Sequence, residues 1–165
     1  MKRTASFVAY SGETTDELLG YPAREQRELV RAFEEGLHRK VSRFGEHTLS
    51  KEEHIVLAVR ALDREVNNGG YDQFFCNSSK KFAPEIVQSL TRIGCRRTAK
   101  ITRRAIAALH SGRVTIAQIE AAMRQPNEER DREFERCDQS FFRTPQGIAK
   151  RLYTFIKANS VRIRL

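Results

Sequence analysis

Residues 65–79 decide the fold, and they read Glu65-Val66-Asn67-Asn68-Gly69-Gly70-Tyr71-Asp72-Gln73-Phe74-Phe75-Cys76-Asn77-Ser78-Ser79. Glycine has no Cβ and asparagine tolerates the left-handed region, so the Asn-Asn-Gly-Gly run can adopt positive φ at low cost. Because it follows an apolar-periodic segment, the run predicts the end of one helix and a sharp change of chain direction. We expect Gly69 or Gly70 to have positive φ, and the Asn67 or Asn68 side chain to bond to the backbone.

The aromatic residues after this run, Tyr71, Phe74 and Phe75, have the spacing of a short helix that returns to the core. The amides beside them can satisfy backbone groups at helix ends, which are costly to bury without partners. The stretch has no histidine near Cys76 to act as its base, and it holds no set of metal ligands. It is therefore interpreted as a buried joint, not as an active site.

Helical periodicity continues on both sides of the joint. Upstream, Ser50 and Glu53 form a capping box that opens a helix running to the joint. Downstream, apolar residues recur at steps of three and four between polar breaks. The helices predicted around the joint cover residues 14–20, 23–44, 50–66, 84–93, 95–110, 115–123, 128–142 and 144–159.

The predicted fold class is all-α, a compact single-domain bundle of about seven or eight helices. No segment has the alternation of β-branched residues and the hairpin turns of a sheet protein. Residues 1–22 are expected to form an N-terminal arm and a short helix, residues 23–160 the helical domain, and residues 161–165 a tail.

Composition narrows the class of protein. The 165 residues are 39% hydrophobic and 31% charged, and no apolar run approaches the ~20 residues that span a bilayer. No apolar signal-peptide core follows Lys2 and Arg3, so a cytoplasmic protein without a membrane partner is expected. The cysteines Cys76, Cys95 and Cys137 are too widely spaced for a disulfide or metal framework, and are expected to be small buried hydrophobes.

Recognisable catalytic patterns are missing. The four histidines form no HExxH or His-x3-His pattern, and no phosphate-binding glycine loop occurs. No catalytic, cofactor-binding or metal-ligating residue is therefore predicted, and the chain is expected not to be an enzyme. An enzymatic alternative would require the amides of Asn67, Asn68, Gln73 and Asn77 to line a pocket instead of capping helices.

Positive charge is concentrated in the middle of the chain, where residues 67–125 hold ten Lys/Arg against three Asp/Glu. One face of the helix predicted at 95–110 carries only cations: Arg96, Arg97, Lys100, Arg103 and Arg104. This face is a candidate site for a polyanion or an acidic protein surface. The alternative is a solvated face that is neutralised by the acidic stretch at 128–138 packed alongside. Aromatic residues are not interleaved with these cations, which argues against single-strand binding.

The joint also resembles the signature of a bacterial domain family that includes a DNA-mimic protein. The pattern is E-x-N-N-G-G-[FY]-x-Q-[FY]-[FL]-x-N, and the residues that match it are Glu65, Asn67, Asn68, Gly69, Gly70, Tyr71, Gln73, Phe74, Phe75 and Asn77. Similar segments follow at 90–95, 134–142 and 153–159, so the resemblance covers about residues 50–160.

The resemblance implies an all-helical fold without known catalytic activity. In the DNA-mimic member, an acidic surface imitates the phosphate backbone and occupies a DNA-binding regulator. This chain departs from that member in its net charge of +9, so mimicry is not expected to carry over. We therefore hypothesise a non-enzymatic regulatory module that binds a protein partner, as a monomer or a homodimer. The alternative is a nucleic-acid-binding protein that uses the cationic helix from Arg96 to Arg104.

Overall fold

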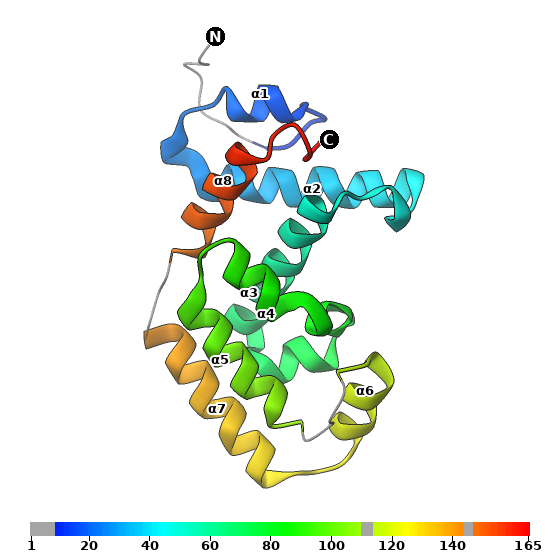
Figure 1. The fold of residues 1–165 in the computed structure, drawn as a ribbon, viewed down its shortest axis with the longest axis vertical. Coiled ribbons are helices and arrows are strands. Elements are labelled where there is room, and N and C mark those ends of the chain that lie inside the picture. Colours follow the sequence, from blue (N-terminus) through cyan, green and yellow to red (C-terminus); the bar gives the residue numbers. More distant parts are fainter. Residues whose placement is uncertain (1–8, 110–113, 144–146) are drawn as a thin grey trace. The chain divides into compact units, whose positions relative to one another are not determined.

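The computed structural model describes residues 9–109, 114–143 and 147–165, and over these ranges the chain is all-α (Figure 1). They contain eight α-helices, three short 3₁₀ helices and no strand, which confirms the predicted fold class. The α-helices are α1 (Thr15–Leu19), α2 (Gln26–Phe44), α3 (Lys51–Cys76), α4 (Ala83–Arg92), α5 (Arg96–Ala107), α6 (Ile116–Arg124), α7 (Glu128–Arg143) and α8 (Ile148–Ala158). The 3₁₀ helices are η1 (Ala23–Glu25), η2 (Glu46–Thr48) and η3 (Ser78–Phe82).

The chain divides into two compact units. The first unit takes the described parts of Met1–Leu57 and Gly147–Leu165, and the second takes those of Ala58–Gln146. Helix α3 begins in the first unit and continues into the second. The division into an arm, one helical domain and a tail stays a prediction.

In the first unit, α2 packs against α8, and α1 packs against α2. Leu29 and Phe33 on α2 are fully buried, as are Leu152 and Ile156 on α8. Each pair is separated by four residues, so both members lie on the same side of their helix. The amphipathic helix predicted at 23–44 is confirmed, with its first turn in 3₁₀ geometry.

Residues 161–165 form neither helix nor strand, yet side chains of the first unit hold them in place. Ile163 is fully buried, and Thr15 Oγ1 donates a hydrogen bond to its carbonyl at 2.7 Å. Ser50 Oγ donates to the Arg162 carbonyl at 2.8 Å. Side chains thus satisfy backbone carbonyls of this segment that no sheet pairs.

Ser50→Ala is expected to lower the free energy of unfolding by about 2 kcal/mol. Ser50 Oγ accepts from the Glu53 N–H at 3.1 Å, and Glu53 Oε2 accepts from the Ser50 N–H at 2.8 Å, which confirms the predicted capping box. The variant loses this cap and the bond to the Arg162 carbonyl together. Thr14→Ala is the control, because Thr14 forms a capping box with Glu17 at the start of α1. Equal losses in urea denaturation would show that the bond to Arg162 contributes nothing.

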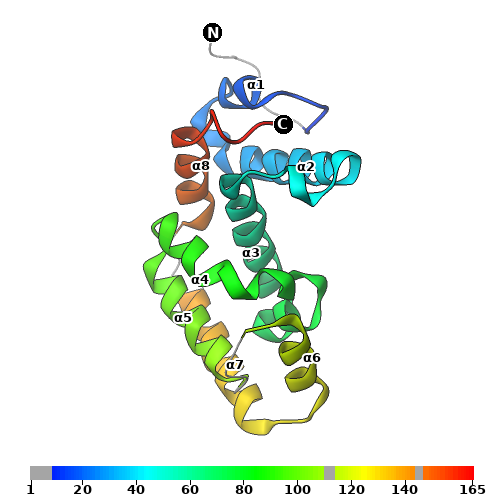
Figure 2. The same ribbon diagram turned by 45° about the vertical axis from the view of Figure 1, so that its right-hand side comes forward.

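In the second unit, α5 packs against both α4 and α7, and α6 packs against η3. Helix α7 runs alongside α5 in both views (Figures 1 and 2). Thr115 caps α6 by accepting from the Gln118 N–H, and Asn127 Oδ1 caps α7 by accepting from the Arg130 N–H at 2.9 Å. These caps place both helix starts where the sequence predicts them. The predicted start of the last helix, at residue 144, lies outside the described residues.

The prediction that all three cysteines are buried is wrong for Cys76. Cys95 and Cys137 are buried, but Cys76 is exposed at the end of α3. It lies one turn after Asp72 on the outer face of that helix, with its Sγ 3.8 Å from Asp72 Oδ2. The aromatic residues beside it occupy the opposite, inner face.

Candidate functional site

The joint interrupts α3, as expected: two helical segments meet here across a kink. Gly69 (φ −159°, ψ 22°) and Gly70 (φ 75°, ψ −171°) leave the helical region, and helical geometry resumes at Tyr71. The expected positive φ is at Gly70, in a region that is essentially restricted to glycine. Asn67 Nδ2 donates to the Asp63 carbonyl at 2.6 Å, which confirms the expected bond from an asparagine side chain to the backbone.

A carboxylate from α7 caps the part of α3 that follows the joint. Asp138 Oδ1 accepts from the Tyr71 N–H at 2.9 Å. This approach requires glycine at position 70, because a Cβ there would overlap the Asp138 carboxylate and lie 2.8 Å from its Cγ. Burial raises the pKa of Asp138, an effect that the bond from Tyr71 partly offsets. The Tyr71 hydroxyl hydrogen-bonds to Thr102 Oγ1 of α5 at 2.7 Å, so α3, α5 and α7 meet at this point.

Glu65 is the centre of a second cluster. Its Oε2 accepts from Gln73 Nε2 at 2.7 Å and from Asn77 Nδ2 at 2.9 Å, and its Oε1 accepts from Ser79 Oγ at 2.9 Å. Burial opposes ionisation, but these three bonds outweigh it and hold the pKa of Glu65 below its usual value. The cluster ties the helix before the joint to the helix and η3 after it. Since Gln73 and Asn77 are engaged in this way, the pocket-lining alternative has no support from them.

The aromatic residues of the joint form the core of the second unit. Tyr71, Phe74 and Phe75 are fully buried. Phe75 stacks on Phe134 of α7 with ring centres 5.3 Å apart, and Tyr71 meets Phe141 of α7 edge-on at 6.4 Å. Such pairs add about 0.5–1.5 kcal/mol beyond the burial of their area. The aromatic side chains of the joint thus hold the second unit together.

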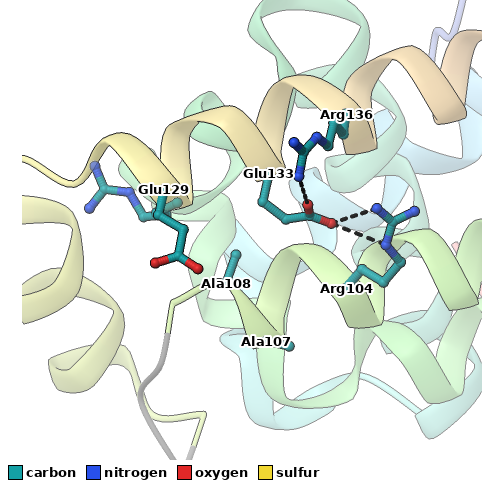
Figure 3. Close-up of a pocket in the computed structure, with 7 residues that line it drawn as sticks. Arg104, Ala107, Ala108, Glu129, Glu133 and Arg136 are labelled. Carbon is teal, nitrogen blue, oxygen red and sulfur yellow. Dashed lines mark hydrogen bonds and ion pairs between the residues drawn. The ribbon is translucent and has the colours of Figure 1, made fainter.

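The cationic face of α5 is exposed, and most of its charge is unbalanced. It consists of Arg96, Arg97, Lys100, Arg103 and Arg104, whose side chains are all exposed. Within the described residues only Arg104 forms an ion pair, with its Nη2 at 2.6 Å from Glu133 Oε1 of α7 (Figure 3). Neutralisation by the acidic stretch at 128–138 therefore applies to one cation of the five.

These cations oppose the stability of α5. Arg96 and Arg97 occupy the first turn, where the helix dipole disfavours positive charge, and no acidic residue compensates there. Lys100 lies four residues after Arg96 and three before Arg103, so like charges repel along the face. Each first-turn cation costs about 0.3–1 kcal/mol, and each like-charge pair about 0.2–0.5 kcal/mol. Proteins break local stability rules of this kind mainly at functional sites.

Acidic residues in the described ranges are interleaved with cations. On α7, Asp131 pairs with Arg130 at 2.7 Å, and Glu133 pairs with both Arg104 and Arg136. On α2, Glu35 pairs with Arg39 one turn later. A phosphate mimic must present negative charge over a broad face. The paired acidic residues of α7 and α2 do not form such a face.

A hollow of about 290 Å³ opens between the end of α5 and α7 (Figure 3). Among the described residues, its lining is formed by Arg104, Ala107, Ala108, Glu129, Arg130, Glu133 and Arg136. Burial alone would raise the pKa of Glu133, but hydrogen bonds from Arg104 and Arg136 outweigh it and lower that pKa. In the part of the chain that the structure describes, no three His, Cys, Asp or Glu side chains are grouped as metal ligands.

Comparison with known proteins identifies the family. A family profile described as DMP19-like protein matches residues 47–159. The chain belongs to the DMP19-like family. DMP19 is a DNA mimic protein, so the resemblance carried by the joint is confirmed. No curated protein sequence matches the chain, and no helix in the described ranges is both long and apolar enough to cross a membrane.

The match to the DMP19-like family includes two residues whose contacts the sequence pattern did not predict, Asp138 and Ser79. Asp138 lies in the segment 134–142 that resembles the family, and this is the one signal that could have pointed to it. Ser79 is the last residue of the stretch 65–79, but no local sequence signal predicts its hydrogen bond to Glu65. Glu133 belongs to the acidic stretch at 128–138 that was expected to pack alongside the cationic face, and it pairs with Arg104 of α5.

Proposed function

We propose that this DMP19-like protein is a non-enzymatic regulatory module that binds an acidic protein partner through the cationic face of α5. It would act in the cytoplasm, as a monomer or a homodimer. The observation that carries the proposal is the unbalanced charge of that face. Four exposed cations have no ion pair with any described residue, and two of them lie at the end of the helix that disfavours them. An acidic partner would supply the missing counter-charge.

A protein surface suits this face better than a nucleic acid does. Helix α7, which runs alongside α5, exposes Glu128, Glu129 and Glu135, and no ion pair joins these three to another described residue. A long phosphate backbone that follows α5 would meet this negative charge, whereas a partner with a limited acidic patch would not. The aromatic side chains of the joint are fully buried, so they offer no platform for stacking bases.

The double substitution Arg96→Glu/Arg97→Glu is expected to abolish partner binding and at the same time to stabilise the fold. The full tagged chain is used to capture partners from nuclease-treated lysate of the source cells. Wild type should retain a defined partner protein, and the variant should retain at least about tenfold less. Its free energy of unfolding should rise by about 0.5–2 kcal/mol, because acids replace cations in the first turn of α5.

The control is Lys150→Glu/Lys157→Glu, which makes the same change in net charge on exposed lysines of α8. It should capture the partner as wild type does. Equal capture by both variants would contradict the proposal. Capture that disappears after nuclease treatment would instead favour nucleic acid, and affinity for duplex DNA should then fall steeply with salt.

A further inference from the structure

The cationic face of α5 leads into the hollow between α5 and α7. Ala107 is exposed on the helix turn after Arg103 and lines the hollow together with Ala108 (Figure 3). Lys100 and Arg103 precede Ala107 by seven and four residues, which places them about 10 Å and 6 Å away along the helix axis. A single ligand segment can therefore reach the cations and the hollow together.

The hollow has an apolar floor, and at one end of its rim two arginines share one glutamate. The Ala108 methyl group lies between the two helices (Figure 3), and Ala107 also lines the hollow. At the rim, Glu133 Oε1 accepts from Arg104 Nη2 at 2.6 Å, and Glu133 Oε2 accepts from Arg136 Nη1 at 3.3 Å. Glu133 is engaged by both arginines, and the alanine methyl groups give the recess an apolar floor that suits an apolar side chain.

Glu129 lines the other side of the hollow and is exposed, without an ion pair to any described residue. Its charge repels carboxylates that extend past the floor, while Arg96, Arg97, Lys100 and Arg103 attract carboxylates before it. The negative charge of a ligand would thus have to end where its apolar side chain enters the hollow.

We infer that this surface binds an acidic segment of a protein that carries one apolar anchor residue. The carboxylates contact the unpaired cations of α5, and the anchor occupies the hollow over Ala107 and Ala108. In an extended segment the acidic run ends two or three residues before the anchor, since each residue spans about 3.3–3.6 Å. This inference rests on the proposed function and adds the chemical pattern of the partner.

The test uses the full chain and two short fluorescent peptides, measured by fluorescence anisotropy. Each peptide is a run of aspartates and glutamates followed, two or three residues later, by one anchor residue. The anchor is leucine in one peptide and serine in the matched peptide. Wild type should bind the leucine peptide about tenfold more tightly than the serine peptide, because only leucine buries apolar area in the hollow.

Ala107→Gln extends a neutral polar side chain over the hollow and should bring the affinity for the leucine peptide down to that for the serine peptide. Ala121→Gln makes the same change at an exposed position of α6 that does not line the hollow, and should bind as wild type does. Arg96→Glu/Arg97→Glu should weaken both peptides alike.

Two outcomes would overturn the inference, and they differ in what they say about the proposed function. If wild type binds both peptides equally and Arg96→Glu/Arg97→Glu weakens both, the anchor is refuted and acidic-partner binding stands. If duplex DNA displaces both peptides and binds more tightly than either, the anchored acidic segment is refuted together with the protein-partner proposal.

Discussion

Gly70→Ala is expected to lower the free energy of unfolding by more than about 3 kcal/mol. Two physical effects add at this position. A residue with Cβ is strained at φ 75° and ψ −171°, at a cost of about 1–3 kcal/mol. The new methyl group would also overlap the Asp138 carboxylate, which must then give up its bond to the Tyr71 N–H. Urea denaturation followed by circular dichroism measures the loss.

The two effects can be separated with Asp138→Ala. In that background the carboxylate is absent, so adding Gly70→Ala should cost only the backbone strain. Gly147→Ala is the control for positive-φ strain, because Gly147 has φ 59° and a Cβ there would meet no heavy atom of a described residue beyond its chain neighbours nearer than 3.8 Å. If Gly70→Ala costs no more than Gly147→Ala, then the close approach of Asp138 is not what requires glycine at the joint.

Local signals predicted the elements of this fold well because their causes are local. The capping box of Ser50 and Glu53 joins residues three positions apart, and it forms as expected. The same holds for the positive φ of Gly70, since the conformational freedom of glycine belongs to the residue itself. Cys76 shows the limit, because its exposure depends on which face of the helix packs after the joint.

The sequence pattern could not predict which individual residues far apart in the chain contact each other. Asp138 caps the helix that begins at Tyr71, a residue 67 positions earlier, and no local period connects them. Helical spacing did place five cations on one face of α5, but it could not decide which of them are neutralised. That depends on the packing of α7, which brings Glu133 to Arg104 and leaves the other four without a counter-charge in the described residues.

The hydrogen bonds to Glu65 are expected to make the stability of the protein depend on pH in the acid range. Glu65 is 7% exposed, and its pKa in the folded protein lies below the usual value because three side chains donate to it. A carboxyl group whose pKa is lowered by folding contributes stability above its unfolded pKa. That contribution is lost as pH falls through the folded pKa. The protein should therefore lose stability below about pH 4.5, where Glu65 begins to be protonated in the unfolded chain.

Glu65→Gln is expected to lower the free energy of unfolding at neutral pH by about 2–4 kcal/mol. The amide keeps the shape of the side chain but removes its charge and directs an N–H toward the donors from Gln73, Asn77 or Ser79. Urea denaturation between about pH 3 and pH 7 should show a constant difference from wild type above about pH 5 that narrows on acidification. Glu135→Gln is the matched control, since Glu135 is exposed on α7 and lies outside its first turn, and its difference should be much smaller throughout. A Glu65→Gln difference that did not change with pH would mean that the ionised carboxylate is not what holds the joint together.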